Sequence, residues 1–178
     1  MNKTDRKLSE GLVFLSNPCI EDMPEFLKKV KTSQYLHHPW VDPPSNEDKY
    51  NAYINRINQD NQKGFFIRLH TSNDIIGVIN INEIVRGCFQ SGYLGFYVFS
   101  GYEGKGYMSE GLKLVISHAF NNLNLHRLEA NIQPDNTKSI KFIKQHHFRN
   151  EGFSPKYLKI NNVWKDHERF AITAEIYH

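Results

Sequence analysis

The sequence has few cysteines, no long apolar run and no strong charge bias. Its two cysteines, Cys19 and Cys88, form no CxxC pair, so a disulfide framework is not indicated and a reducing compartment is expected. There is no stretch of about 18 consecutive apolar residues, which a membrane-spanning helix would require. The segment Met1–Gly11 is polar and has no apolar signal-peptide core. We therefore expect a soluble cytoplasmic protein without membrane contact.

Internal repeats, linkers and metal-ligand spacings are also missing. The 178 residues suit one domain, residues 1–178, and a net charge of +3 is too small to indicate direct nucleic-acid binding. Adjacent histidines occur at His37-His38 and His146-His147. Neighbouring side chains point in different directions on a strand or a helix, and no Cys or carboxylate stands at ligand spacing. We expect hydrogen-bonded or solvated histidines and no metal.

The chain does contain a strand, a glycine turn, a helix and a second strand in succession. The pattern predicts a strand at Tyr93–Phe99, a helix over about Tyr107–Asn121 and a strand at Arg127–Ile132. Two strands joined through a helix form a right-handed parallel crossover, because a tight turn cannot connect parallel neighbours. The polar turn that follows opens another helix, with Asp135 or Asn136 as its N-cap.

The turn of this unit places Gly104 and Gly106 where the chain passes from strand to helix. Bare backbone N–H groups and the positive end of the helix dipole together form an anion site, most naturally for phosphate. The P-loop motif is disfavoured because Gly106 follows Lys105, where that motif needs Ser or Thr. The dinucleotide fingerprint fits poorly, since it needs a third glycine at Ser109. A plain structural turn remains an alternative, because a glycine pair alone is weak evidence.

The turn resembles the pyrophosphate-binding turn of the GNAT acyl-coenzyme A transferases, which reads Gln/Arg-Gly-x-Gly-x-Gly/Ala after a strand. Gly104 and Gly106 match, whereas Glu103 replaces Gln or Arg and Met108 replaces the final small residue. With its flanks, the chain is similar to the Rim-type ribosomal-protein alanine N-acetyltransferases, a branch that tolerates Met there. The resemblance is dense over 76–172 and before that rests on the order of elements. Matching segments are Ile76-Gly77-Val78, Tyr93-Leu94-Gly95-Phe96, His126-Arg127, Ala130-Asn131, Glu151-Gly152 and Trp164-Lys165-Asp166-His167.

This resemblance implies an α/β GNAT fold, with a mixed, mostly antiparallel seven-stranded sheet, about four flanking helices and one parallel pair splayed at the coenzyme site. Hydrophobic periodicity predicts amphipathic helices at Met23–Val30 and Tyr50–Ile57, with a capping box at Ser45-Asn46-Glu47-Asp48. Asn161-Asn162 suits a hairpin turn. The family normally has glycine at the position of His147, so we expect that helix end to avoid left-handed geometry. Further strands are predicted at Leu12–Leu15, Gly64–His70, Ile75–Val85, Phe148–Ile160 and Val163–Ile176.

By the same resemblance, the cosubstrate is acetyl-coenzyme A. Val98 and Phe99 are expected to bind its pantetheine arm through unpaired main-chain groups, and the Val98 N–H to polarise the thioester carbonyl. Asn136 is expected to contact the coenzyme, and Lys105 to add positive charge near phosphate. Backbone amides that would hold the pyrophosphate belong to Glu103, Gly104, Lys105, Gly106, Tyr107 and Met108.

The catalytic candidates are Ser139, Asn131 and Glu129. The resemblance places Ser139 near the sulfur, where its hydroxyl could protonate the leaving thiolate, because Ile143 occupies the position of a Tyr used by many GNAT enzymes. A local role at the helix start is the alternative. A related branch has a Glu where this chain has Asn131, and Glu129 lies about 7 Å away on the same strand face. We assign Asn131 to orienting water and Glu129 to the general base, acting through that water.

The acceptor site is least determined by the sequence. Trp40 lies in a loop that lines the acceptor site in GNAT folds, although core packing is as good an explanation. Asp42, Glu47, Asp166 and Glu168 are expected on two sides of one acidic mouth, unless they are ordinary surface. We predict acetyl transfer to a protein N-terminus, that of a ribosomal protein, by a monomer or homodimer. A small-amine acetyltransferase acting on an antibiotic or polyamine, or a non-catalytic coenzyme A-binding regulatory module, remain alternatives.

Overall fold

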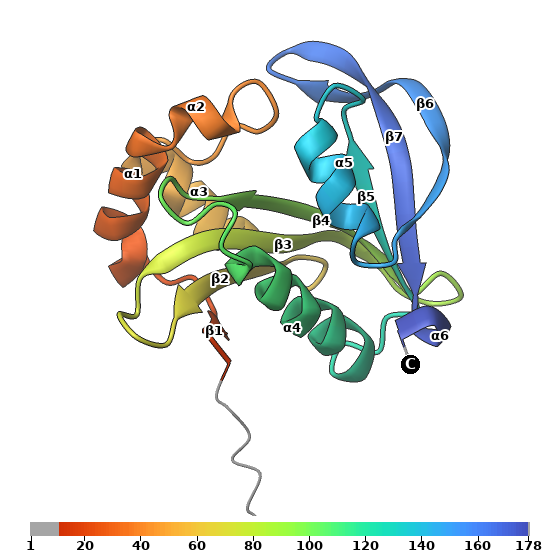
Figure 1. Cartoon of the computed structure of the whole chain (residues 1–178), viewed down its shortest axis with the longest axis horizontal. Coiled ribbons are helices and arrows are strands. Elements are labelled where there is room, and N and C mark those ends of the chain that lie inside the picture. The colour runs from red at the N-terminus through yellow and green to blue at the C-terminus, as the bar shows by residue number, and fades with distance from the viewer. Residues whose placement is uncertain (1–10, 178) are drawn as a thin grey trace, which may run out of the picture.

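The computed structural model describes residues 11–177, so the polar segment before residue 11 lies outside the described residues. Its centre is one seven-stranded mixed sheet (Figure 1). Only β4 and β5 pair in parallel among these strands, and all other neighbours are antiparallel, as the resemblance implies. In spatial order the strands are β1 (Val13–Ser16), β2 (Lys63–Leu69), β3 (Ile75–Val85), β4 (Ser91–Val98), β5 (Arg127–Ile132), β7 (Val163–Thr173) and β6 (Arg149–Ile160).

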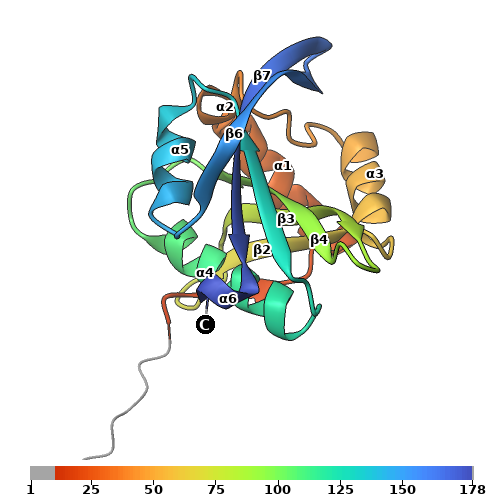
Figure 2. The ribbon, with the colours of Figure 1, turned by 90° about the vertical axis from the view of Figure 1, so that its right-hand side faces the viewer.

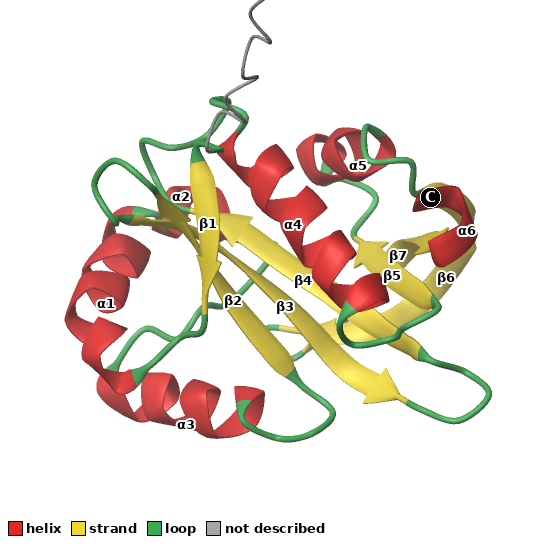
Figure 3. Cartoon of the chain, turned by 90° about the horizontal axis from the view of Figure 1, so that it is seen from below, coloured by secondary structure: helices red, strands yellow, loops and turns green. Residues whose placement is uncertain are grey.

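Helices cover both faces of the sheet, α4 and α5 on one and α1 and α3 on the other (Figure 3). Six α-helices occur in the described residues, against about four expected. The difference is α2 and α6, which have four residues each. No helix within 11–177 is both long and apolar enough to cross a membrane. The helices are α1 (Met23–Thr32), α2 (Gln34–His37), α3 (Glu47–Ile57), α4 (Tyr107–Asn121), α5 (Thr137–Lys144) and α6 (Ala174–Tyr177), and a 3-10 turn, η1 (Ile20–Asp22), precedes α1.

Each face of the sheet has its own hydrophobic core, because side chains alternate between the faces of a strand. On the α4 side, Leu112, Val115 and Ile116 of α4 pack on β2, β3 and β5. On the α1 and α3 side, Phe26 lies at the centre, with its ring in contact with other aromatic rings. These partners of Phe26 are Tyr50, Tyr53, Phe66 and Phe99.

Most of the predicted turns and helix ends are present in the structure, although one differs. Asn161 and Asn162 have φ of 48° and 64°, as the predicted hairpin turn requires. The N-cap of α3 is Asn46, whose side chain accepts the Lys49 N–H, so the cap lies one residue later than the predicted box. The prediction for His147 is wrong, because its φ is 64° and the helix end is left-handed. Phe148 follows at once and is buried, and β6 begins at the next residue, Arg149.

The last predicted strand is shorter than its hydrophobic pattern suggested. Strand β7 ends at Thr173, and the remaining residues up to Tyr177 form α6. Strands β6 and β7 form a long hairpin whose tip extends beyond the rest of the sheet (Figure 2). This hairpin and the α2–α3 connection approach the same end of the molecule (Figure 1).

A buried guanidinium fastens the α1 side to the sheet. Arg68 of β2 is 6% exposed and forms ion pairs with Asp22 and Glu25. Its remaining donors bind Ser16 Oγ at 2.9 Å and the Asn73 carbonyl at 2.6 Å. Removing one member of a buried pair leaves the other charge without compensation, so this cluster holds η1 and the start of α1 in place.

We predict that Arg68→Met lowers the free energy of unfolding by about 3 kcal/mol, because two carboxylates lose their buried partner. Lys49→Met is the matched control, since the Lys49–Asp42 pair is largely exposed and should contribute less than about 1 kcal/mol. Urea unfolding of both variants measures the difference. Equal effects would show that the Arg68 cluster does not anchor α1.

Candidate active site

The parallel pair at the centre of the sheet separates early. Pairing between β4 and β5 stops at Leu94 and Ala130, although β4 continues to Val98 and β5 to Ile132. The two strands then diverge, with α5 beside the opening (Figure 1). This opening between the two strands, bounded by the end of β4, is called the gap below. The predicted splay is confirmed.

The gap is lined by main-chain groups of Phe96 and Val98. The Phe99 N–H donates to the Ile76 carbonyl of β3 at 2.9 Å. Because alternate residues of an antiparallel ladder point their N–H and C=O groups to opposite sides, those of Phe96 and Val98 point away from β3. The expectation for Val98 therefore fits the strand geometry.

The expectation for Phe99 is wrong. Its N–H is bound to β3, its carbonyl accepts the Tyr102 N–H at 3.2 Å, and its ring is fully buried. No main-chain group of Phe99 is left for a coenzyme. Phe96 instead has its main-chain groups on the gap side, and the available signal was the two-residue alternation that groups it with Val98.

The glycine turn after β4 leaves room for a bulky anion. Gly104 and Gly106 have φ of 72° and 81°, which L-residues with side chains rarely adopt. A Cβ added at either position would meet no atom within 4 Å, so the space above the turn is open. Gly106 is the N-cap of α4, and no side chain caps that helix. Backbone donors and helix dipole thus face open space, which fits the pyrophosphate of a coenzyme.

Glu103, which departs from the family pattern, braces the turn. Its carboxylate accepts a hydrogen bond from the Tyr35 hydroxyl at 3.1 Å, and that hydroxyl also pairs with Ser100 Oγ at 2.9 Å. Backbone N–H groups, its own first, and then Tyr35 keep the pKa of Glu103 below its ordinary value. The charge is therefore held by α2 and the turn backbone.

The segment 33–37 fixes the end of β4 by two further hydrogen bonds. Ser33 Oγ accepts the Ser100 N–H at 2.9 Å, and His37 Nε2–H donates to the Val98 carbonyl at 2.9 Å. Burial lowers the pKa of His37, so its ring is neutral at neutral pH. The expectation of a hydrogen-bonded histidine is confirmed at His37. With its carbonyl occupied, Val98 offers only its N–H to the gap.

Side chains near the turn have separate roles. The Lys105 ammonium lies 5.9 Å and that of Lys29 4.7 Å from the centre of the Tyr102 ring, so two cations stand beside the turn.

Met108 packs over Gly77 of β3, where an added Cβ would lie within 2.4 Å of its sulfur. The larger residue at Met108 is thus accommodated by a glycine on the sheet. Tyr107 likewise packs against the core, so both residues offer only backbone to the turn.

Helix α5 brings Asn136 and Ser139 beside the gap. Asn136 is the predicted N-cap, and its Oδ1 accepts the Ser139 N–H at 3.2 Å. The Ser139 hydroxyl is half-buried and has no hydrogen-bond partner within residues 11–177. The Phe142 ring lies 5.3 Å from that of Phe96 on β4, which sets α5 against the gap. A hydroxyl free to donate therefore stands near the exposed main chain of β4.

Glu129 and Asn131 lie on the other face of the sheet. Leu128 and Ala130 belong to the core beneath α4, so Glu129 and Asn131 alternate to the side opposite α5. Glu129 is 8% exposed and accepts a hydrogen bond from Arg127 Nε at 2.8 Å. Asn131 Oδ1 is buried without a partner in the described residues. Glu129 and Asn131 therefore lie on one face of the sheet and Ser139 on the other. The gap is the place where groups from the two faces can reach the same ligand.

An open groove of about 180 Å³ reaches β4 from the α3 side. Trp40 does not line it, but the next residues of its loop do. Trp40 is half-buried, and its carbonyl accepts a long hydrogen bond of 3.5 Å from Gln133. The groove floor includes Phe96, which also faces the gap. Its lining is Val41, Asp42, Pro43, Pro44, Tyr53, Arg56, Asn80, Gly95, Phe96 and Tyr97.

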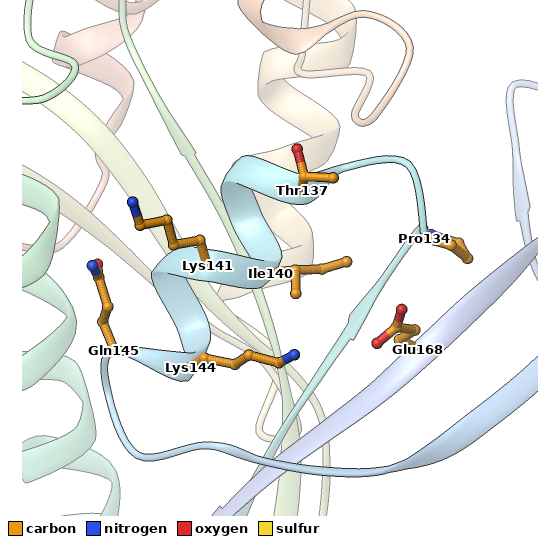
Figure 4. Close-up of a pocket in the computed structure, with 7 residues that line it drawn as sticks. All are labelled: Pro134, Thr137, Ile140, Lys141, Lys144, Gln145 and Glu168. Atoms are coloured by element: carbon orange, nitrogen blue, oxygen red, sulfur yellow. The ribbon is translucent and has the colours of Figure 1, made fainter.

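The expected acidic mouth is wrong, because Asp42 and Glu168 line two separate grooves. Asp42 lines the groove described above, whereas Asp166 accepts the Lys156 N–H at 2.7 Å. Glu168 accepts from Asn150 and lies in a separate open groove of about 570 Å³ on α5, where Lys144 points toward it (Figure 4). Strand parity explains the error, since Glu168 shares the α5 face with buried Phe170. This second groove is lined by Pro134, Thr137, Ile140, Lys141, Lys144, Gln145 and Glu168.

Comparison with known proteins identifies the family to which this fold and site belong. Residues 13–149 match the sequence profile of the acetyltransferase (GNAT) domain. The chain belongs to the GNAT acetyltransferase family. Within residues 11–177, no three or more His, Cys, Asp or Glu side chains are grouped so that they could hold a metal ion.

Two curated relatives illustrate the range of the family. The Bacillus subtilis protein YjcK, named a probable N-acetyltransferase, is 36% identical over 120 residues, covering 67% of this chain and 66% of YjcK. The ribosomal protein uS5-alanine N-acetyltransferase of Escherichia coli is 33% identical over 129 residues, covering 70% of this chain and 66% of the relative. The matched region thus spans about two thirds of each relative.

Solved structures extend the similarity to nearly the whole chain. RimJ of Mycobacterium smegmatis, in complex with CoA-disulfide, is 25% identical with a TM-score of 0.84, covering 93% of this chain and 84% of RimJ. A spermidine N-acetyltransferase chimera of the Vibrio cholerae enzyme SpeG is 20% identical with a TM-score of 0.79, covering 94% of this chain and 98% of the chimera. At that identity, the second likeness shows the fold alone.

We predict that Gly106→Val abolishes coenzyme A binding, because a branched side chain would fill the space above the turn and disfavour its backbone angles. Gly87→Val is the matched control. Gly87 also has positive φ and open space around it, but it lies between β3 and β4, away from the turn. Calorimetry with coenzyme A should show binding for the control and none for Gly106→Val, with both variants folded. Equal binding by both would make the turn purely structural.

Proposed function

We propose that the protein transfers an acetyl group from acetyl-coenzyme A to the N-terminal amine of a protein, and that ribosomal proteins are its acceptor class. The observation that carries the proposal is a two-sided access to the same stretch of β4. The glycine turn and α5 approach the gap from one face of the sheet, and the groove reaches Phe96 from the other. A donor and an acceptor can therefore meet at the gap without sharing an entrance.

The coenzyme side is formed mainly by backbone. We assign the pyrophosphate to the amides of 103–108, with Lys105 adding positive charge and Asn136 contacting the coenzyme from α5. The pantetheine arm runs beside the exposed main chain of Phe96 and Val98, as an added strand would. Bound acetyl-coenzyme A supplies an acetyl group activated as a thioester.

The chain's own groups provide polarisation and proton transfer. The Val98 N–H donates to the carbonyl oxygen where negative charge develops. The free hydroxyl of Ser139 gives its proton to the departing thiolate and regains a proton from solvent water. Asn131 holds a water through its unpaired Oδ1, and Glu129 takes the amine's proton through that water. An α-amine with a pKa near 8 is already partly neutral. A strong general base is therefore not needed, and Glu129 can serve even though it also binds Arg127.

The acceptor enters through the groove beside the Trp40 loop, with Trp40 as a contact for the residues that follow the N-terminus. Arg56 lines this groove, and its fixed charge disfavours a polyamine, which carries several positive charges of its own. This contrast favours the protein acceptor over the small amine.

We place the protein in the cytoplasm, acting through one domain as a monomer or homodimer, with free Cys19 and Cys88 consistent with a reducing compartment.

Turnover with acetyl-coenzyme A tests the proposal. We predict acetylation of short peptides that begin with Ala or Ser, with kcat/KM at least about 10-fold above that for spermidine, and none of the same peptides once their N-termini are blocked. Intact-mass analysis of ribosomal proteins from cells with and without this chain then identifies the acceptor. Faster turnover of spermidine would establish the small-amine function instead. Coenzyme binding without turnover of any amine would establish the regulatory module.

We predict that Ser139→Ala lowers kcat by about 10- to 1,000-fold with little change in coenzyme affinity, because only protonation of the thiolate is lost. Ser117→Ala is the control, since Ser117 lies on α4 and its hydroxyl accepts from Asn121 at 3.2 Å, away from the gap. Single-turnover kinetics isolates the chemical step. A Ser139→Ala rate equal to that of the control would reduce Ser139 to a residue of the helix start.

A further inference from the structure

Asn80 of β3 stands in a row of residues that crosses three strands. Its register partners are Gly64 on β2 and Gly95 on β4, so neither neighbouring strand places a side chain beside it. An added Cβ at Gly64 would lie 2.8 Å from the Tyr53 hydroxyl, which shows that this glycine admits the hydroxyl. Gly95 leaves the floor of the groove open. Gly64 and Gly95 thus leave space on both sides of the Asn80 side chain.

The orientation of the Asn80 carboxamide is fixed from α3. The Tyr53 hydroxyl donates to Asn80 Oδ1 at 2.9 Å. Both residues are more than nine-tenths buried, with 4% and 7% of their surfaces exposed for Tyr53 and Asn80. Burial raises the pKa of Tyr53 well above its ordinary value, so the hydroxyl keeps the proton that it donates. With its oxygen bound to Tyr53, the carboxamide is left with its NH₂ group.

That NH₂ group is a free donor in the groove. Asn80 lines the groove, and its Nδ2 makes no hydrogen bond within residues 11–177. It is also absent from the described side-chain atoms that are sealed from solvent without a partner. Solvent can therefore reach Nδ2 in the free protein, and a bound group that displaces this water without offering an acceptor leaves the donor unpaired, at a cost of about 1–3 kcal/mol. The groove therefore favours a ligand that places an acceptor atom, such as a carbonyl oxygen, at Nδ2.

The neighbouring charges agree with a carbonyl in this position. Arg56 donates to Asn82 Oδ1 at 2.7 Å and keeps further N–H groups on the wall of the groove. Asp42 is the carboxylate among the lining residues. A protein N-terminus offers one positive amine followed directly by a carbonyl oxygen. A polyamine offers only donors and positive charge, so it would leave Asn80 unpaired and meet the like charge of Arg56.

We propose that Asn80, oriented by Tyr53, binds a backbone carbonyl oxygen of the acceptor next to the amine that is acetylated. Asn80 is then the residue that makes a polypeptide N-terminus a better acceptor than a polyamine. This inference rests on the proposed function and names the group by which the same site recognises its substrate class.

The test compares two acceptors on three forms of the protein. One acceptor is a short peptide that begins with Ala, and the other replaces its first peptide bond by a trans-alkene, which keeps the shape and removes the carbonyl oxygen. Wild type should favour the peptide by about 10- to 100-fold in kcat/KM, since an unpaired donor costs that much. Asn80→Ala should bring the ratio close to one, and Tyr53→Phe should lower it. Calorimetry with coenzyme A present should show the same pattern in acceptor Kd.

Tyr50→Phe is the matched control, because Tyr50 is a buried tyrosine of α3 like Tyr53, but its hydroxyl donates to the Cys19 carbonyl at 2.7 Å and it does not line the groove. It should retain the wild-type ratio. Thermal unfolding and coenzyme A affinity establish that each variant is folded, and Tyr53→Phe tests the inference independently if Asn80→Ala does not fold. A wild-type ratio near one, or equal losses for both acceptors, overturns the role of Asn80. Spermidine turnover with no binding of either acceptor overturns the proposed function itself.

Discussion

The early separation of β4 from β5 is the constraint on which the rest of this site depends. A parallel pair in the centre of a sheet normally satisfies its main-chain groups on both sides, and buried groups left unpaired are costly. Here the pairing ends at Leu94 and Ala130, and the next gap-facing residues are Phe96 and Val98. The same backbone that would complete a sheet is therefore available to a ligand. The stretch where β4 and β5 no longer pair and the proposed reaction site coincide.

Neighbouring segments keep the gap open in a defined shape. Ser33, Tyr35 and His37 each bind the end of β4 or the turn that follows. On the other side, Ser109 of α4 and His146 beyond α5 pair at 2.8 Å, which joins the two helices that flank the coenzyme side. These contacts come from residues far apart in sequence. The site is thus held by side chains while its proposed ligand contacts are largely backbone.

Much of the crossover could be predicted from the sequence. Both α4 and β5 have the predicted bounds, because an amphipathic helical period and the alternation of polar and apolar residues along a strand are local signals. The errors at Phe99 and Glu168 have a different origin. Which of two alternating residues faces a neighbour depends on strand register, and a shift of one residue reverses it. Register is set by long-range pairing, which short-range patterns do not specify.

The side-chain braces were beyond local reasoning for a related reason. His37 belongs to a His-His pair with no distinctive spacing, and its role becomes visible only when α2 lies against Val98. Asn80 appears in sequence as one polar residue of a strand. Its significance depends on Gly64 and Gly95 being its partners and on Tyr53 of α3 reaching across. Such constellations are assembled by tertiary structure and carry no sequence motif of their own.

Amide hydrogen exchange along the end of β4 measures the central claim most directly. In the free protein, the account predicts fast exchange at Phe96 and Val98, which face the gap, and slow exchange at Tyr97 and Phe99, which face β3. Saturating acetyl-coenzyme A should slow exchange at Phe96 and Val98 and leave Tyr97 and Phe99 unchanged. Equal protection of all four amides in the free protein, or no change at Phe96 and Val98 on binding, would contradict a gap that receives the coenzyme.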